Sequence, residues 1–231
     1  MEARRHDLLR LGAGGWQALL RRRPDLAGIA AVQAWAARLH PAMSRRRQAD
    51  DAPGWLPAAI ALPPSEGRAR LAFELLAGEI DAVLPPPLLH DALGGALGGA
   101  WPGRLPGAWI EPARRLVGVG GRLGIAPRLF GSLMWQCVTG MPYARDGSDL
   151  DLLWVLPPGA DALARVPALL AALDAIRSEG VRVDGEIVFP DGAANWQELL
   201  AARPEDEVLV KTETAITLTT RARLLDPAAR R

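Results

Sequence analysis

The chain of 231 residues contains one cysteine, one lysine and no long hydrophobic run. Cys137 is the single cysteine, which excludes an intramolecular disulfide bond and a cysteine-based zinc cluster and is typical of a reducing compartment. The longest nearly apolar run covers residues 27–39 and is shorter than the roughly 20 residues that a membrane-spanning helix needs. Charged side chains stand near the start, where an export signal would build its apolar segment. These absences predict a cytoplasmic protein that does not span a membrane.

Neither sign of charge dominates, because 27 basic side chains stand against 26 acidic ones and leave a formal net charge of +1. Nucleic-acid-binding proteins usually carry a clear basic excess, so no nucleic-acid partner is expected. Nearly all of the basic charge is arginine, and Lys211 is the only lysine. A lysine presents a compact positive charge, which makes Lys211 a candidate phosphate ligand, although a surface lysine without a specific role is the commoner case.

Proline and glycine concentrate in residues 84–107, where they disfavour long regular elements. We expect the domain boundary there, with a smaller N-terminal α/β domain and this connector in residues 1–107 and a second domain in residues 108–231. A hydrophobic share of 49% is enough to build both cores. Arginine clusters interrupt the short apolar segments of the first half, so we assign no individual elements there.

The second half shows regular hydrophobic periodicity, and glycines mark where its helices end. The predicted helices cover residues 109–123, 131–139, 163–176 and 196–202. The predicted strands cover residues 125–130, 149–156 and 181–189, and a hairpin joins residues 208–212 to 215–220. This alternation indicates an α/β or α+β fold.

The first chemical signal is the pair Gly131 and Ser132 between a predicted strand and a predicted helix. Glycine lets a ligand approach the backbone closely, and a helix N-terminus offers free N–H groups with a partial positive charge. The pair therefore predicts a phosphate-binding turn, while a plain helix cap is the simpler alternative. Gln136 lies on another side of the same helix and is a further candidate for substrate contact.

The second signal is a pair of aspartates, Asp149 and Asp151, at the start of the predicted strand 149–156. Side chains two apart on a strand project from the same face, so the two carboxylates would lie close together. A cation would offset their repulsion, and hard oxygen ligands suit magnesium. The alternative is that Asp149 caps the strand and Asp151 faces solvent.

The third signal is Asp184 with Glu186 on the predicted strand 181–189, again two residues apart. A carboxylate from a neighbouring strand is suited to receive or direct the proton of a nucleophile in magnesium-dependent phosphoryl chemistry. Geometry does not choose between the two residues. Asp184 followed by Gly185 is also typical of a turn or bulge.

The order of these signals resembles the DNA polymerase beta-like nucleotidyltransferase superfamily, in which Gly-Ser opens a helix, Asp-x-Asp follows, and a carboxylate lies on a later strand. RLFGSLMWQCVTGMPYARDGSDLDLLW, residues 128–154, resembles one subgroup, the malonate decarboxylase holo-acyl-carrier-protein synthases, which are phosphoribosyl-dephospho-CoA transferases. The resemblance extends to residues 182–192, 195–199 and 208–212 and, more weakly, to residues 4–8 and 62–73.

This resemblance implies a nucleotidyltransferase domain with a mixed sheet and flanking helices in residues 108–231. It implies transfer of a phosphoribosyl-dephospho-CoA group from 2'-(5''-triphosphoribosyl)-3'-dephospho-CoA to a serine of the apo acyl-carrier subunit of malonate decarboxylase, with release of pyrophosphate. Its implied roles are magnesium binding by Asp149 and Asp151, assistance to the serine by Asp184 or Glu186, and phosphate binding by Gly131, Ser132, Gln136 and Lys211. Transfer to a hydroxyl of a small molecule is one alternative, and a catalytically idle binding module of the same fold is another.

Overall fold

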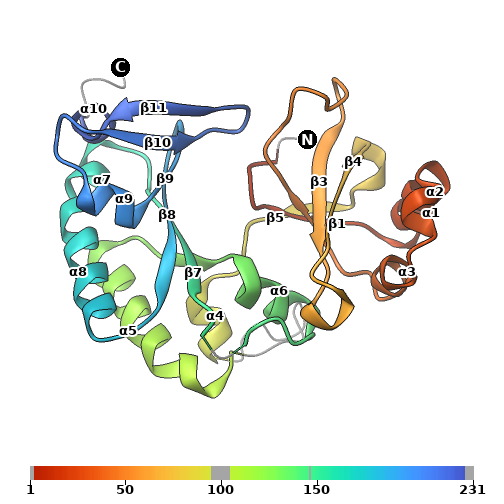
Figure 1. The fold of residues 1–231 in the computed structure, drawn as a ribbon, viewed down its shortest axis with the longest axis horizontal. Coiled ribbons are helices and arrows are strands. Elements are labelled where there is room, and N and C mark those ends of the chain that lie inside the picture. The colour runs from red at the N-terminus through yellow and green to blue at the C-terminus, as the bar shows by residue number, and fades with distance from the viewer. Residues whose placement is uncertain (1–2, 95–104, 146, 227–231) are drawn as a thin grey trace.

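The structure is a computed structural model that describes residues 3–94, 105–145 and 147–226. Two β-sheets face each other, and helices cover the outer face of each (Figure 1). This α+β arrangement agrees with the predicted fold class. Part of the predicted connector, residues 95–104, lies outside the described residues. No helix in the described ranges is long and apolar enough to cross a membrane.

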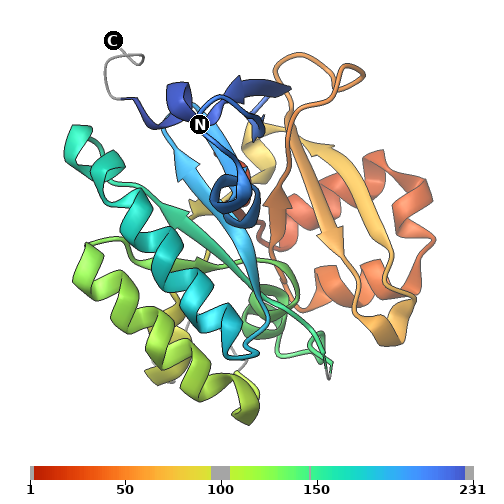
Figure 2. The ribbon, with the colours of Figure 1, turned by 60° about the vertical axis from the view of Figure 1, so that its left-hand side comes forward.

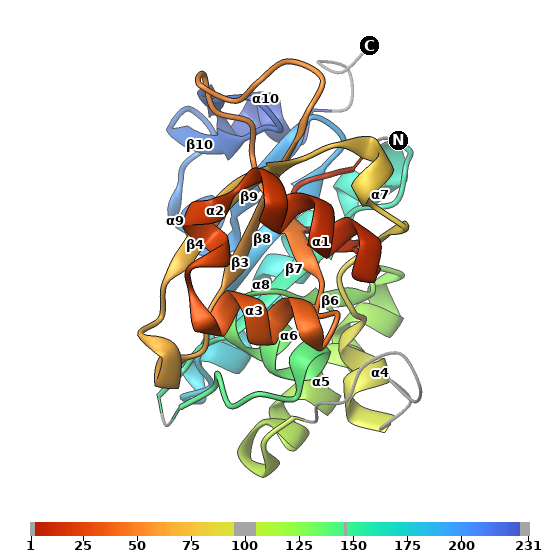
Figure 3. The same ribbon diagram turned by 90° about the vertical axis from the view of Figure 1, so that its right-hand side faces the viewer.

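The N-terminal sheet is antiparallel and has five strands in the order β4-β3-β2-β1-β5. Its strands are β1 (Leu8–Arg10), β2 (Ala42–Ser44), β3 (Leu56–Ala61), β4 (Arg70–Leu75) and β5 (Ala82–Leu84). Helices α1 (Ala13–Arg22), α2 (Pro24–Ala27) and α3 (Ala30–Ala37) cover its outer face, as Figure 3 shows from that side. Two short 3-10 turns, η1 (Pro64–Glu66) and η2 (Ala77–Glu79), flank β4.

Alternation along the strands of this sheet explains why the helices cover only one face. Phe73 on β4 is buried on the outer side, where its ring meets Trp16 of α1 edge-on with ring centroids 6.3 Å apart. Ala58 and Ile60 on β3 are buried on the same side. The residues between them, which include Ala59 and Ala72, point the other way because successive strand side chains alternate. One face therefore belongs to the core and the other faces the second sheet.

The C-terminal sheet is mixed and has six strands in the order β11-β10-β9-β8-β7-β6. Its strands are β6 (Pro127–Leu129), β7 (Leu150–Val155), β8 (Val183–Phe189), β9 (Gly192–Asn195), β10 (Glu207–Lys211) and β11 (Ile216–Thr220). Its helices are α4 (Leu89–Gly94), α5 (Gly107–Leu123), α6 (Gly131–Thr139), α7 (Ala160–Ala164), α8 (Val166–Ser178), α9 (Trp196–Ala201) and α10 (Arg221–Leu225). Every helix and strand that the sequence predicts in this half is present.

One predicted helix is divided, because α7 and α8 are separate and meet at Arg165. Figure 2 shows α8 beside α5 along the outer face of the C-terminal sheet. Together α7 and α8 form the crossover that lets β7 and β8 pair in parallel. Helix α4 contacts α5 and β6, so residues 89–94 pack with the second domain although the predicted boundary lies at residue 107.

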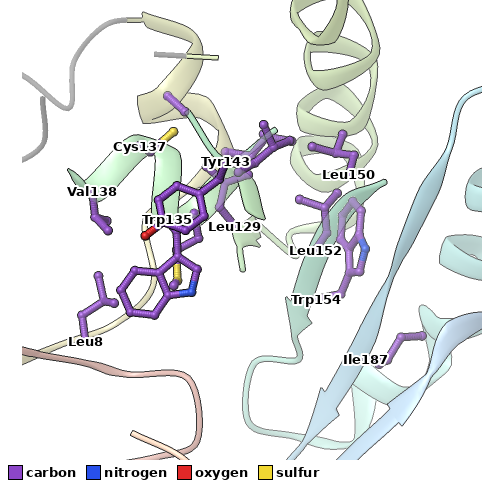
Figure 4. Close-up of a cluster of buried hydrophobic side chains, with 14 of the residues drawn as sticks. Leu8, Leu129, Trp135, Cys137, Val138, Tyr143, Leu150, Leu152, Trp154 and Ile187 are labelled. Atoms are coloured by element: carbon purple, nitrogen blue, oxygen red, sulfur yellow. The ribbon is translucent and has the colours of Figure 1, made fainter. Parts of the chain in front are cut away.

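A continuous hydrophobic core joins the two halves and holds α6 and β7 in place (Figure 4). The ring of Trp135 on α6 meets the ring of Trp35 on α3 edge-on, with centroids 5.4 Å apart. Trp154 on β7 is fully buried. The Tyr143 hydroxyl donates a hydrogen bond of 2.6 Å to the carbonyl of Ala61 on β3. The functional elements of the second domain are therefore anchored to the first.

Helix α5 approaches the chain that leads into β6 closely at one glycine. A Cβ atom on Gly120 would lie 2.6 Å from both the Ile125 carbonyl oxygen and Pro127 Cδ. A Cβ atom on the neighbouring Gly121 would meet nothing within 4 Å. Gly120 is therefore required for this close approach, whereas Gly121 is not.

We expect Gly120→Ala to lower the free energy of unfolding by about 1–3 kcal/mol, because the new methyl group forces α5 away from residues 125–127. The matched variant Gly121→Ala should raise it by about 0.5–1 kcal/mol, since alanine favours the helix and the site is open. Urea unfolding followed by circular dichroism measures both. Equal effects of the two substitutions would contradict this packing.

Candidate active site

A cavity of about 770 Å³ lies between the inner faces of the two sheets. The C-terminal wall carries the Gly131–Ser132 turn and the carboxylates of Asp151, Asp184 and Glu186. The opposite wall comes from strands β2, β3 and β4 of the N-terminal sheet. The cavity therefore gathers most of the residues that the sequence singles out, and it adds a second wall that the sequence does not predict.

Asp151 and Asp184 form the centre of the carboxylate wall. They are register partners on the parallel strands β7 and β8, so their side chains project from adjacent positions. Burial, and after it the negative charges of Asp184 and Asp149, raise the pKa of the Asp151 carboxyl to about 6. A cation at this position would remove that repulsion.

The glycine turn before α6 fits around Asp151. Gly131 has a left-handed backbone with φ of 64°, and a Cβ atom there would lie 2.0 Å from Oδ2 of Asp151. The backbone N–H of Ser132 donates a hydrogen bond to the Asp151 carboxylate and partly opposes the rise in its pKa. Glycine is therefore required at position 131 for the carboxylate to fit, whether or not the turn also binds phosphate. The predicted phosphate contact stays a prediction.

Asp149 lies just before β7 and is turned toward a neighbouring pocket. Its Oδ1 accepts a hydrogen bond of 2.7 Å from Nε of Arg182, and its side chain is 42% exposed. That pocket, of about 480 Å³, is also lined by Asp184. Asp149 thus lines this second pocket, is not among the described residues that line the large cavity, and has its charge balanced by Arg182.

Asp184 is oriented by hydrogen bonds to its Oδ1 atom. The Asn195 side chain donates one of 2.9 Å through Nδ2, and the Gly185 backbone N–H donates one of 2.7 Å. Asn195 also caps α9, because its Oδ1 accepts from the N–H groups of Gln197 and Glu198. Asn195 is a positioning residue that the sequence reading missed, although its capping position before α9 is a visible signal.

Glu186 is only 4% exposed and binds the two ends of the chain together. Its carboxylate pairs with Arg5 and, at 2.8 Å, with Nζ of Lys211, while Nε2 of His6 lies 3.8 Å away. Burial alone would raise the pKa of Glu186, but His6, Arg5 and Lys211 outweigh it and lower the pKa to about 2. Glu186 is therefore held in its negatively charged form, and the amino group of Lys211 is paired with it.

The N-terminal segment enters the cavity through His6, which the sequence reading did not assign to the site. Its backbone is left-handed with φ of 77°, and its ring lies against Phe130 with centroids 5.1 Å apart. Burial lowers the pKa of His6, which favours the neutral ring. The weak family resemblance of residues 4–8 assigned no role to Arg5 or His6, because their contacts depend on a strand far along the chain.

Gln136 supports a loop. Its Oε1 accepts hydrogen bonds from the backbone N–H groups of Tyr143, at 3.2 Å, and Ala144, at 3.0 Å. Gln136 is not among the residues that line the cavity in the described part of the chain. The structure thus gives it a different function from the predicted substrate contact, which no observation supports.

The carboxylates suit magnesium as partial ligands. In the described ranges no group of three or more His, Cys, Asp or Glu side chains is gathered closely enough to form a complete protein cage. Magnesium in phosphoryl-transfer sites usually takes one or two carboxylates and completes its coordination with water and substrate phosphates. Burial first, and then the negative charges of Asp184 and Asp149, raise the pKa of Asp151, so a cation at this carboxylate would relieve the repulsion between them.

Comparison with known proteins covers both halves of the chain. The model of the phosphoribosyl-dephospho-CoA transferase MdcG N-terminal domain matches residues 4–86, and that of the C-terminal domain matches residues 96–222. The phosphoribosyl-dephospho-CoA transferase of Bradyrhizobium diazoefficiens is 33% identical over 225 residues, which cover 97% of this chain and 93% of the relative. Those of Xanthomonas campestris pv. campestris and Xanthomonas axonopodis pv. citri are 34% and 35% identical, with 84% of each chain covered. No solved structure matches.

Asp151→Asn should raise the thermal unfolding midpoint by about 2–6 °C near pH 8 without magnesium, because it removes a half-buried negative charge. The pKa of this carboxyl rises from 3.8 to about 6 on folding. The negative charge therefore does not destabilise the folded state below pH 3.8, and it destabilises that state by its full amount above about pH 6. The increase in the unfolding midpoint of Asp151→Asn over that of the wild type should therefore disappear near pH 4. Calorimetry at both pH values measures it.

The matched control is Asp174→Asn, an exposed aspartate of α8 that pairs with Arg177 and should change the midpoint little. Added magnesium should raise the midpoint of the wild type and leave that of Asp151→Asn unchanged, since the variant lacks the charge that holds the ion. An equal magnesium response in both proteins would count against a metal site at Asp151.

Proposed function

The chain belongs to the phosphoribosyl-dephospho-CoA transferase family, and we propose that it transfers the phosphoribosyl-dephospho-CoA group from 2'-(5''-triphosphoribosyl)-3'-dephospho-CoA to a serine of an apo acyl-carrier subunit. Membership of the family makes the chain a transferase. The observation that carries the proposal is the Asp151 and Asp184 pair beside the glycine turn, inside a cavity that both family domains build. We propose the carrier of malonate decarboxylase as the acceptor and the cytoplasm as the location.

Magnesium held by Asp149 and Asp151 would neutralise charge that builds on the donor phosphates as pyrophosphate leaves. Asp151 faces the cavity and needs only to lose its proton, which its pKa of about 6 allows at neutral pH. Asp149 would have to exchange its hydrogen bond with Arg182 for the ion. Arg182 is exposed and free to turn away, because its side chain has no other polar contact in the described ranges. This donor set is shared with the DNA polymerase beta-like superfamily, to which we propose that the second domain belongs.

In the bond-forming step, the serine Oγ attacks the α-phosphorus of the donor and the bond from that phosphorus to the pyrophosphate oxygen breaks. The serine proton must pass to a base in the same step or before it. Asp184 is suited to receive it, because it faces the cavity and Asn195 fixes its orientation. Glu186 is poorly suited, because Arg5 and Lys211 hold it as an anion with a pKa of about 2.

The turn at Gly131 and Ser132 opens α6 next to this centre, and we propose that its remaining N–H groups contact the pyrophosphate portion of the donor. Lys211 lines the same cavity and contributes positive charge near the carboxylates. Its amino group is shared with Glu186, so its effect on phosphate is weaker than that of a free lysine.

The direct test mixes the protein with apo-carrier, the triphosphate donor and magnesium and follows the carrier by mass spectrometry. We expect the mass to rise by one prosthetic group with release of pyrophosphate, and to stay constant with a carrier whose acceptor serine is replaced by alanine. Asp149→Asn and Asp151→Asn should each abolish loading while the circular dichroism spectrum is kept. An unmodified carrier, together with ready nucleotidyl transfer to a small alcohol, would overturn the proposal in favour of a small-molecule enzyme.

Asp184→Asn and Glu186→Gln separate the two candidates for the third carboxylate. Asp184→Asn should reduce kcat about 100-fold or more with little change in stability, because it removes the proton acceptor. Glu186→Gln should instead lower the free energy of unfolding by about 1.5–3 kcal/mol, because it weakens charged hydrogen bonds to Arg5 and Lys211. Stopped-assay kinetics and urea unfolding of both variants measure the difference. The assignment fails if Glu186→Gln loses turnover at full stability while Asp184→Asn keeps it.

A further inference from the structure

The second wall of the cavity is the inner face of the N-terminal sheet, which no helix of the described residues covers (Figure 1). Residues of β3 and β4 that point away from the core form this wall, including Ala59 and Ala61 on β3 and Arg70 and Ala72 on β4. Their neighbours in sequence, such as Ala58 and Phe73, are buried and point toward the helices. Apolar residues on this uncovered face are unusual, because sheets that are covered on one side usually present polar residues to water on the other.

The middle of this wall is flat and apolar. Ala59 and Ala72 are register partners on adjacent strands, and Ala61 follows two residues later on the same face. We call these three residues the alanine patch. Because alanine extends no further than Cβ, a planar ring can lie against the sheet there. Tyr143 lies beside the patch, where its hydroxyl is held by the Ala61 carbonyl.

Two arginines border the alanine patch, and neither is neutralised. Arg68 and Arg70 line the cavity, and within the described ranges their side chains make no ion pair and no hydrogen bond. A third, Arg45, is already paired with Asp51. Arg68 has a left-handed backbone with φ of 55° in the turn before β4, a conformation that non-glycine residues seldom adopt. The turn therefore holds this side chain at the cavity despite a cost in backbone free energy.

The charges of the two walls are opposite. Arg68 and Arg70 lie on one wall of the cavity, and the carboxylates of Asp151, Asp184 and Glu186 lie on the other. A polyanion between the walls would meet carboxylates on one side and free guanidinium groups on the other. Guanidinium groups bind phosphate oxygens in a bidentate manner, and an arginine-lined wall attracts anions into the cavity.

We propose that the N-terminal sheet supplies the nucleotide subsite of the donor, in which Arg68 and Arg70 bind its phosphates and the alanine patch holds its adenine ring. This inference rests on the proposed function, because that function defines the donor as a triphosphate joined to dephospho-CoA. It assigns the N-terminal domain to donor binding and leaves the bond-forming step to β7 and β8.

Binding of two donor fragments to the full chain tests the subsite. With EDTA present, inorganic tripolyphosphate probes the arginines without a metal contribution, and 3'-dephospho-CoA probes the alanine patch. We expect the double variant Arg68→Ala, Arg70→Ala to weaken tripolyphosphate binding at least tenfold. We expect Ala59→Leu to weaken dephospho-CoA binding at least tenfold and to leave tripolyphosphate binding unchanged, since leucine fills the space of the ring. Isothermal titration calorimetry measures each of these affinities.

The matched control is Arg38→Ala, which removes an exposed arginine at the end of α3 in the helix layer, outside the cavity lining, and should bind both probes as the wild type does. The subsite proposal is overturned if the wild type binds neither probe, or if the double arginine variant or Ala59→Leu binds its probe with unchanged affinity. If the wild type binds both fragments as expected but does not load the carrier, the proposed function is overturned and the subsite proposal stands.

Discussion

Two neighbouring, partly buried carboxylates, those of Asp151 and Asp184, determine what the active site can bind. The parallel pairing of β7 and β8 places Asp151 directly beside Asp184, and parallel pairing requires the crossover that α7 and α8 provide. Gly131 leaves the space that the Asp151 carboxylate occupies. A like-charge pair of this kind either keeps a proton or gains a cation. The same geometry that favours a metal ion therefore also sets the pH below which the ion would be lost.

The N-terminal domain completes this centre from outside. Its inner sheet face closes the cavity and carries positive charge, while the carboxylates lie on the opposite wall. Glu186 fixes the distance between the walls, because Arg5 of the first domain and Lys211 of the second bind the same carboxylate. A residue with the appearance of a third catalytic carboxylate is thus better understood as the joint between the domains. Asp184, two residues earlier, remains available for chemistry.

Local signals made most of the second domain predictable. The bounds of α6 follow from Gly131 and Ser132 at its start and Gly140 at its end, all readable within ten residues. A continuous apolar run likewise identified β7, and the apolar residues on both sides of Asp184 and Glu186 identified β8. The first domain was not predictable in this way, because β1, β2 and β5 have three residues each, too few to show a period of two.

The site was predictable in its residue types and less so in their roles. Period-two alternation put Asp184 and Glu186 on one face and could not choose between them, since the difference arises from Arg5, which is 181 positions away. Arg70 escaped notice for the same reason. Its importance depends on which face of the N-terminal sheet turns toward the second domain, and hydrophobic patterns within one strand do not contain that information.

The joint at Glu186 also has a consequence for how the chain folds. Its contact with Arg5 spans 181 residues, and the hydrogen bond from the Arg5 backbone to Glu213 spans 208. During synthesis the first domain leaves the ribosome long before Glu186 and Glu213 have been made. Its inner face is therefore exposed to solvent while the rest of the chain is synthesised. Contacts that close such long loops form late and slowly. Arg68 and Arg70 give that face positive charge, which opposes its pairing with the same face of another chain during that interval.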